Sequence, residues 1–282
     1  DSISRPGNFI FHMNLKTAPN KQNGIFYARF FCYMIKDGPG CRCIEASALS
    51  GLDWRSVLTG SVRQGIFYPL YKNLLLSAND NIIPSEFRDE FKQTYYLSLL
   101  KSAESVSRVK RILERIEAYK IRVLFFKGFA IDALIYDDYM RPRLDVDIAA
   151  ADEDSGILEK ALSSLGYVLS PSEKGYPIPE YLNSRVFAHS SGDFPSVHIH
   201  RHLINNMFLV VDGYLNADMR DIWEEAEPLK GYRYILALKP ELNIIYLCEH
   251  GLKHDFDQIV FLYEIDRLIS YYGQGMDWNK FL

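Results

Sequence analysis

The hydrophobic period of this 282-residue chain changes abruptly near Ile121, and that change constrains the fold more than any other feature. The segment from Ser85 to Lys120 contains no Gly or Pro, and its apolar side chains recur at spacings of three, four and seven. This pattern predicts one long amphipathic helix, or two shorter ones. The segment that follows, Ile121 to Phe126, is short and apolar except for Arg122, which is typical of a buried strand.

Further short strands and helices are expected after this point. Apolar and acidic residues alternate in Asp145 to Ala150, which predicts a strand, and Gly166 is a suitable end for a helix from Ser155 to Leu165. We also expect a short helix at Phe129 to Tyr136, strands at Arg185 to His189 and Ser196 to His202, and helices from about Asp218, clearest at Pro240 to His250 and Asp257 to Ser270. A small mixed sheet with helices, flanked by N- and C-terminal helical regions, is an α+β fold.

We divide the chain into four regions on this basis. Residues 1–48 form an N-terminal segment with no clear period, 49–120 a helical region, 121–212 a core that contains the strands, and 213–282 a C-terminal helical region. Hydrophobic residues make up 48% and charged residues 24%, a balance that excludes a disordered chain. The net charge of −4 provides no overall positive field, so a polynucleotide partner is not expected.

Neither a membrane span nor an export signal is expected. The most apolar run, Gly24 to Ile35, contains Arg29 and is shorter than the roughly 20 residues that cross a bilayer. The first residues lack a basic start followed by an apolar stretch. The four cysteines, Cys32, Cys41, Cys43 and Cys248, form no Cys-x-x-Cys motif and suit free thiols in a reducing compartment. We therefore expect a cytoplasmic protein.

Residues 125–154 (FFKGFAIDALIYDDYMRPRLDVDIAAADED) contain the residue types that phosphate binding requires. Lys127 and Gly128 lie where the first strand meets a helix; glycine allows a ligand to approach the backbone, and a helix start offers N–H groups to anions. Arg141 and Arg143 carry guanidinium groups that match phosphate oxygens. The same residues also fit a plain strand-to-helix turn and surface ion pairs, so each feature alone is weak.

The pair Asp145 and Asp147 is the expected metal centre. Residues two apart on a strand point to the same face, with Cα atoms about 7 Å apart. Two carboxylates in this arrangement can hold Mg²⁺, with Mn²⁺ as an alternative, and such ions bridge substrate phosphates. A solvated strand face is the simpler interpretation of an isolated Asp-x-Asp, and only the combination with the preceding turn and arginines favours a site.

This combination resembles the nucleotidyltransferase fold of the DNA polymerase β superfamily. More narrowly, it is similar to a bacterial family of uncharacterised nucleotidyltransferases with a Leu-Lys-Gly, Tyr, Arg-Pro, Asp-x-Asp progression. The matching residues are Phe126-Lys127-Gly128, Tyr136, Arg141-Pro142 and Asp145-Val146-Asp147. The resemblance extends over roughly residues 50 to 270. Residues 128–134 also resemble a Gly-Trp-Ala-Val-Asp-Ala-Leu pattern of lincosamide-type nucleotidyltransferases.

The resemblance implies transfer of a nucleoside monophosphate from an NTP to a hydroxyl of a small molecule or protein. Asp145 and Asp147 would hold Mg²⁺, and Lys127, Gly128, Arg141 and Arg143 would bind the nucleotide. The superfamily takes a third carboxylate from a later strand, where this chain has His198 within Val-His-Ile-His. Imidazole can act as a base or bind softer metals but replaces carboxylate poorly around Mg²⁺.

The departure at His198 leaves other functions open. The chain can be an active enzyme, a catalytically impaired relative that binds a nucleotide or a partner, or a toxin-type nucleotidyltransferase. His250 and His254, four residues apart on an expected helix, can bind metal, but a role in helix packing is the simpler interpretation. Asp132 is expected to be exposed or a local hydrogen-bond partner rather than a catalytic residue.

Overall fold

The computed structural model describes residues 24–35, 49, 51–76, 82–135, 145–170, 184–192, 194–201, 203 and 219–281. The chain forms two compact units, one of residues 1–95 and 258–260, the other of residues 96–257 and 261–282. The long helix α5 (Ser85–Ala118) contributes to both units, as does α10 (Ile259–Tyr272). Within the described residues, no helix combines the length and the apolar character that a bilayer span requires.

The first unit contains the helices α1 (Gly24–Ile35), α3 (Trp54–Arg63) and α4 (Phe67–Leu76) and the start of α5. Asp53 caps α3, because its carboxylate accepts hydrogen bonds from the backbone N–H groups of Arg55 and Ser56. Phe91 of α5 is fully buried and contacts the ring of Trp54 with centroids 6.0 Å apart. Helix α1 falls in the segment for which the sequence predicted no regular structure.

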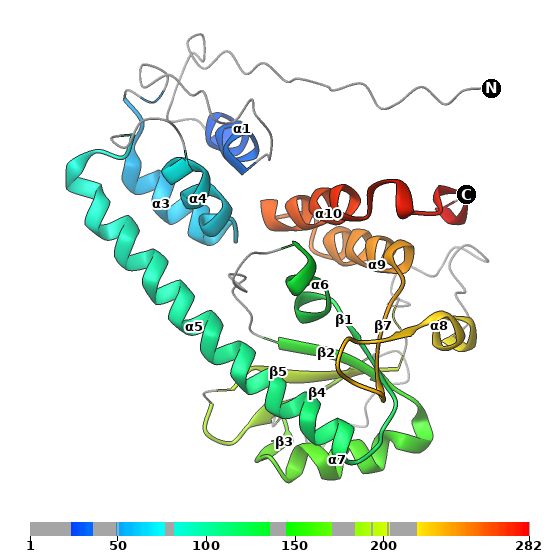
Figure 1. The fold of residues 1–282 in the computed structure, drawn as a ribbon. Coiled ribbons are helices and arrows are strands. Elements are labelled where there is room, and N and C mark those ends of the chain that lie inside the picture. The colour runs from blue at the N-terminus through cyan, green and yellow to red at the C-terminus, as the bar shows by residue number, and fades with distance from the viewer. Residues whose placement is uncertain are drawn as a thin grey trace. The chain divides into compact units, whose positions relative to one another are not determined.

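The second unit is built on a mixed sheet of seven strands in the order β3-β4-β5-β2-β1-β7-β6 (Figure 1). The strands are β1 (Val123–Phe126), β2 (Asp145–Ala150), β3 (Tyr167–Leu169), β4 (Ser184–His189), β5 (Ser196–His200), β6 (Glu227–Pro228) and β7 (Ile235–Ala237). At the centre, β2 pairs in parallel with β5 and antiparallel with β1, and β1 pairs in parallel with β7. The expected α+β arrangement, a mixed sheet with helices, is confirmed.

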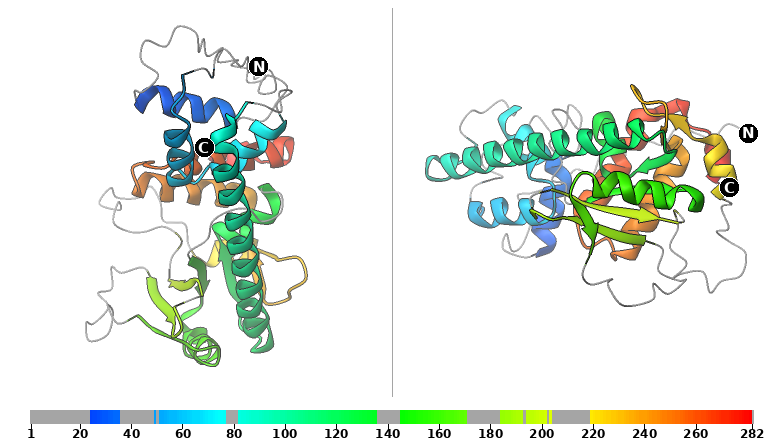
Figure 2. Two further views of the ribbon diagram at one scale, coloured as in Figure 1. Left: turned by 90° about the vertical axis from the view of Figure 1, so that its left-hand side faces the viewer. Right: turned by 90° about the horizontal axis from the view of Figure 1, so that it is seen from below.

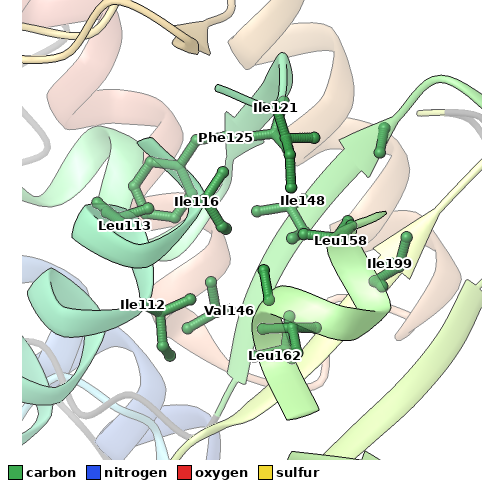
Figure 3. Close-up of a cluster of buried hydrophobic side chains, with 14 of the residues drawn as sticks. Ile112, Leu113, Ile116, Ile121, Phe125, Val146, Ile148, Leu158, Leu162 and Ile199 are labelled. Carbon is green, nitrogen blue, oxygen red and sulfur yellow. The ribbon is translucent and has the colours of Figure 1, made fainter. Parts of the chain in front are cut away.

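One face of this sheet packs on the last turns of α5 and on α7 (Ser155–Ser163). Figure 3 shows the contact: Ile112, Leu113 and Ile116 of α5 and Leu158 and Leu162 of α7 surround Val146 and Ile148 of β2. Gly166 follows α7 with a φ of +89°, as a left-handed helix end requires. This apolar layer is the main core of the unit.

The opposite face packs on α8 (Met219–Glu225) and α9 (Pro240–Lys253). Leu124 and Phe126 of β1, Ala149 of β2 and Tyr246 of α9 belong to this second cluster. In Figures 1 and 2 the helices α7 and α9 lie on opposite sides of the sheet. The site residues lie on the α9 side, and a short helix, α6 (Gly128–Ile135), follows β1 directly.

The sequence expectation was wrong in the C-terminal region, where only helices were predicted. Ile235–Ala237 forms the strand β7. It is a strand because its backbone pairs with β1, which lies more than a hundred residues earlier in the chain. The strand β3 was also not predicted. Arg141, Arg143 and His202 lie outside the described residues.

Candidate functional site

The site is formed by the acidic and imidazole side chains of two neighbouring parallel strands. In the register of β2 and β5, Asp147 pairs with His198, Asp145 with Ser196 and Ala149 with His200. Val146 and Ile148 belong to the core on the other face, so the alternation that the sequence predicted for β2 is observed. Asp145 and Asp147 therefore share the α9 side of the sheet with His198 and His200.

Asp147 is the most constrained of these residues, with only 3% of its surface exposed. One of its carboxylate oxygens, Oδ1, has three cationic or imidazole neighbours. Lys127 Nζ lies 3.1 Å away, His200 Nε2 lies 2.8 Å away and His198 Nδ1 lies 3.9 Å away. A buried carboxylate needs partners of this kind to remain ionised.

The balance of these effects determines the charge of Asp147. Burial raises the pKa of its carboxyl, but the hydrogen bond from His200 and the charge of Lys127 oppose burial and outweigh it, so the pKa lies well below its ordinary value. For His200, burial lowers the pKa of the imidazole despite the hydrogen bond to Asp147. We therefore describe this centre near neutral pH as an ionised carboxylate that accepts a hydrogen bond from a neutral His200 and faces a lysine ammonium.

The backbone at Lys127 is unusual. Its φ is +58°, in the left-handed region, and its carbonyl accepts hydrogen bonds from the N–H groups of Ala130 and Ile131. A non-glycine residue in this region is strained by about 1–2 kcal/mol. The sequence predicted that Gly128 lets a ligand approach the backbone at a helix start, and the structure makes Gly128 the first residue of α6, with the left-handed turn one residue earlier. This turn leads from β1 into α6 and directs the ammonium of Lys127 to Asp147.

Aromatic rings from β1 and α9 enclose the charged groups. Tyr246 packs edge-on against Phe126, with ring centroids 5.0 Å apart, and Lys127 Nζ lies 5.6 Å from the centre of the Tyr246 ring. Phe126 also contacts the ring of His200. Burial raises the pKa of the Tyr246 hydroxyl well above its ordinary value, and the negative charges of Asp147, Glu249 and Asp145 raise it further. The influence of Asp145 on Tyr246 agrees with its position on this side of the sheet.

His198 and His200 differ in how they meet Asp147. The sequence pointed to His198 as the residue in place of a third carboxylate, but His200 makes the direct hydrogen bond and is the more buried of the two, with 11% of its side chain exposed against 26%. His198 Nε2 lies 3.1 Å from the hydroxyl oxygen of Ser196. The alternation of Val197 and Ile199 with the two histidines was a signal that could have identified His200.

The remaining predicted residues are not joined to this cluster by the described contacts. His250 and His254 pack on each other, with ring centroids 4.6 Å apart, and both contact Phe261. Arg141, Arg143 and the side chain of Asp132 lie outside what the structure describes. The helix-packing interpretation of His250 and His254 therefore agrees with these contacts.

The donor atoms of Asp147, His198 and His200 lie within 4.8 Å of one another, close enough to be ligands of one metal ion after small side-chain rotations. Asp145 is a second carboxylate at the start of the same strand. The two carboxylates suit Mg²⁺, whereas the two imidazoles suit softer dications. Oxygen donors from β2 and nitrogen donors from β5 thus meet at one centre.

The model of a family described as uncharacterised nucleotidyltransferases matches residues 50–282. A comparison with curated proteins gives no match. Among solved structures, the chain is similar to the antibiotic-resistance factor ANT(2″)-Ia in solution, with 15% identity, 62% of this chain and 87% of that chain covered, and a TM-score of 0.44.

Two further structures show a similar level of likeness. ANT(2″)-Ia in complex with adenylyl-2″-tobramycin has 16% identity, coverage of 60% of this chain and 90% of that chain, and a TM-score of 0.41. The lincosamide antibiotic adenylyltransferase LnuA, bound to lincomycin, has 18% identity, coverage of 58% and 96%, and a TM-score of 0.38.

Proposed function

The chain belongs to the family of uncharacterised nucleotidyltransferases, and from this premise we propose that it transfers a nucleoside monophosphate from an NTP to a hydroxyl group. The acceptor is a small molecule or a protein, and the reaction takes place in the cytoplasm. The observation that supports this proposal best is the buried, ionised carboxylate of Asp147, which lies beside a second aspartate on one strand and within reach of a lysine at a strand-to-helix turn.

Asp145 and Asp147 are the proposed ligands of a divalent cation, Mg²⁺ or Mn²⁺. Their position on one face of β2 supports this role, as does the partial exposure of Asp145 at the strand start. A cation bound there would polarise the phosphate oxygens of the substrate and favour ionisation of the acceptor hydroxyl.

Lys127 is the proposed phosphate-binding residue of the chain. Its ammonium pairs with Asp147, and its backbone immediately precedes α6, where Gly128 presents backbone at a helix N-terminus. A lysine in this position can neutralise the charge that develops on the leaving pyrophosphate. Arg141 and Arg143, which precede β2 in the sequence, are proposed to add further contacts to the phosphates.

His198 is the proposed proton acceptor. Its imidazole is partly exposed, lies 3.9 Å from Asp147 Oδ1 and is oriented by the hydroxyl of Ser196. In the transfer, the acceptor oxygen forms a bond to the α-phosphorus while the bond from that phosphorus to the bridging oxygen breaks, and pyrophosphate leaves. The proton of the acceptor hydroxyl passes to His198, a transfer for which an imidazole is well suited near neutral pH.

A transfer assay with α-labelled NTPs tests this function. The purified chain is incubated with each NTP, Mg²⁺ or Mn²⁺, and extracts of small molecules or proteins, and labelled products are separated from the NTP. We expect a labelled product for the wild type and at least a hundredfold slower labelling for Asp147→Asn, because the variant loses the charge on which the site depends. Asp266→Asn on the exposed side of α10 is the matched control and should retain the wild-type rate.

The assay also separates this proposal from a second one. His198 occupies the position where the superfamily pattern has a carboxylate, and this supports a catalytically impaired relative that still binds nucleotide. That relative would be stabilised by NTP in thermal unfolding but would give no labelled product with any NTP or cation. If Asp147→Asn forms labelled product at the wild-type rate, Asp147 does not belong to the active site and the proposed site is wrong.

A further inference from the structure

We propose that Asp147, His198 and His200 form a three-ligand site that binds a transition-metal dication of the Mn²⁺, Co²⁺ and Zn²⁺ class in preference to Mg²⁺. This inference deepens the proposed function and rests on it for the use of the metal, because it names the cation that the site selects. It also changes the role of His198 from proton acceptor to metal ligand, so that the bound cation would favour ionisation of the acceptor hydroxyl. Binding of the metal itself depends only on the three side chains and is measured without nucleotide.

The backbone brings the three ligands together. The parallel register of β2 and β5 sets Asp147 beside His198, and His200 follows two residues later on the same face. Their donor atoms lie within 4.8 Å of one another, and His200 Nε2 is 2.8 Å from Asp147 Oδ1. Ligands that each lie about 2.0–2.2 Å from one ion are separated by roughly 3–3.5 Å, a range that the observed separations bracket. Modest rotations of the imidazoles are enough to converge on a metal.

The chemistry of the donors sets the preference. Imidazole nitrogen suits Zn²⁺ and other first-row transition-metal dications, of which Mn²⁺ binds most weakly, whereas Mg²⁺ takes oxygen ligands, demands near-octahedral geometry and retains several waters. The side chains of Asp147 and His200 are 2% and 11% exposed, so the centre offers little room for a hydrated ion. Two imidazoles therefore disfavour Mg²⁺ because they are not oxygen ligands. The mostly buried position disfavours it because there is little room for the waters that Mg²⁺ retains.

Lys127 acts as the resident counter-charge of this site when no metal is bound. Its ammonium lies 3.1 Å from Asp147 Oδ1, the same oxygen that His200 contacts. A dication that binds Asp147 replaces this positive charge, and the flexible lysine stem allows the ammonium to turn to a phosphate. The negative charges of Asp145 and Glu249 nearby, both of which act on Tyr246, favour occupation by a dication.

A Co²⁺ titration of the full chain, first freed of metal with a chelator and kept without nucleotide, tests the site. We expect one equivalent of Co²⁺ to bind, with the visible absorption of a nitrogen-ligated ion, and a large excess of Mg²⁺ to leave that spectrum unchanged. Zn²⁺ should displace Co²⁺ and abolish the visible absorption, because it is a d¹⁰ ion that takes the same imidazole and carboxylate ligands in tetrahedral sites.

Ligand variants identify the residues that bind the ion. His198→Gln and His200→Gln should each weaken Co²⁺ binding by more than the roughly 10- to 100-fold that loss of an outer-shell partner causes. His254→Gln, an exposed histidine at the end of α9, is the matched control and should bind Co²⁺ as the wild type does. Lys127→Met should bind Co²⁺ more tightly than the wild type, because the competing ammonium is absent.

Thermal unfolding in chelator shows whether each variant is folded. If His200→Gln does not fold, His198→Gln still tests the site, because His198 is partly exposed and its replacement should disturb folding less. Displacement of Co²⁺ by Mg²⁺ at a comparable concentration, or unchanged affinity in folded His198→Gln, would overturn the inference. If Co²⁺ binds as expected and no cation supports transfer, the proposed function fails and the metal site remains. If Mg²⁺ supports transfer and Co²⁺ does not bind, the inferred metal site fails and the proposed function remains.

Discussion

The two faces of the strand pair β2 and β5 contrast sharply in chemistry. On one face, Val146 and Ile148 of β2 and Val197 and Ile199 of β5 are buried against α5 and α7. On the other face the same strands present Asp145, Asp147, His198 and His200. One backbone register therefore serves both the core and the candidate site, and a shift of one residue would destroy both at once.

The two faces are stabilised in different ways. The apolar face gains free energy from burial that depends on volume and tolerates rearrangement among similar side chains. The polar face depends on specific partners, because Asp147 is buried and, among the residues that the structure describes, Lys127, His200 and His198 compensate its charge. Replacement of such a buried ion pair by apolar side chains is often neutral or stabilising, so stability alone does not account for the charge of Asp147.

Truncation on the apolar face is expected to have the largest effect on stability. Ile148→Ala removes a fully buried side chain from the centre of the core between α5 and α7 and should lower the free energy of unfolding by about 2–5 kcal/mol. Urea unfolding of the wild type and variant measures this difference. Ile157→Ala, at a residue of α7 that is 43% exposed, is the control and should change it by about 0.5 kcal/mol or less. Equal losses in the two variants would contradict the assignment of the core.

Loss of the charge partner on the polar face should have a smaller effect. Lys127→Met leaves Asp147 with only its imidazole neighbours and should lower the free energy of unfolding by about 1–3 kcal/mol. The cycle with Asp147→Asn and the double variant isolates the pair, and we expect the double variant to be more stable than the sum of the single losses predicts. Strict additivity would show that the ion pair does not contribute to the folded state.

The backbone of Lys127 provides a finer test of the same turn. Lys127→Gly and Lys127→Ala both remove the ammonium, but only glycine adopts a φ of +58° without strain. We expect Lys127→Gly to be the more stable of the two by about 1 kcal/mol in urea unfolding, because relief of about 1–2 kcal/mol of strain exceeds the entropy that glycine adds to the unfolded chain. If Lys127→Ala is as stable as Lys127→Gly, residue 127 does not keep its left-handed conformation.

Alkaline pH should affect the apolar face through Tyr167. Burial raises the pKa of Tyr167, which lies in the core and donates a hydrogen bond to the carbonyl of Pro195, to about 12 from an ordinary value of 10.0. The folded state therefore retains this proton longer than the unfolded state does, so the stabilisation is complete below pH 10 and is lost as pH rises toward 12. Tyr167→Phe should unfold with a shallower dependence on pH in this range, as urea unfolding at several pH values would show. An unchanged slope would contradict the burial of this hydroxyl.

Much of the framework could be predicted because its signal is local. The predicted helix at Ser85 to Lys120 is observed as α5 (Ser85–Ala118), and the predicted strand at Asp145 to Ala150 is observed with the same bounds. Both segments carry a clear hydrophobic period, and period alone decides which side chains share a face. The family resemblance is confirmed by the match over residues 50–282.

The features that were missed depend on contacts between distant parts of the chain. The strand β7 has three residues and exists because it pairs with β1, which no local pattern reveals. Alternation correctly grouped His198 with His200, but it could not show which imidazole reaches Asp147, since that depends on side-chain rotation and on the packing of Phe126. In the same way, the left-handed backbone at Lys127 results from the hydrogen bonds that start α6 rather than from its residue type.

A crystal structure of the chain with a non-hydrolysable NTP and Mn²⁺ tests most directly whether the polar face of β2 and β5 is the nucleotide site. We predict anomalous density for the cation within coordination distance of Asp147, and a triphosphate that meets Lys127 and the start of α6 at Gly128. A nucleotide bound elsewhere, with Asp147 still paired only to Lys127 and His200, would contradict the account.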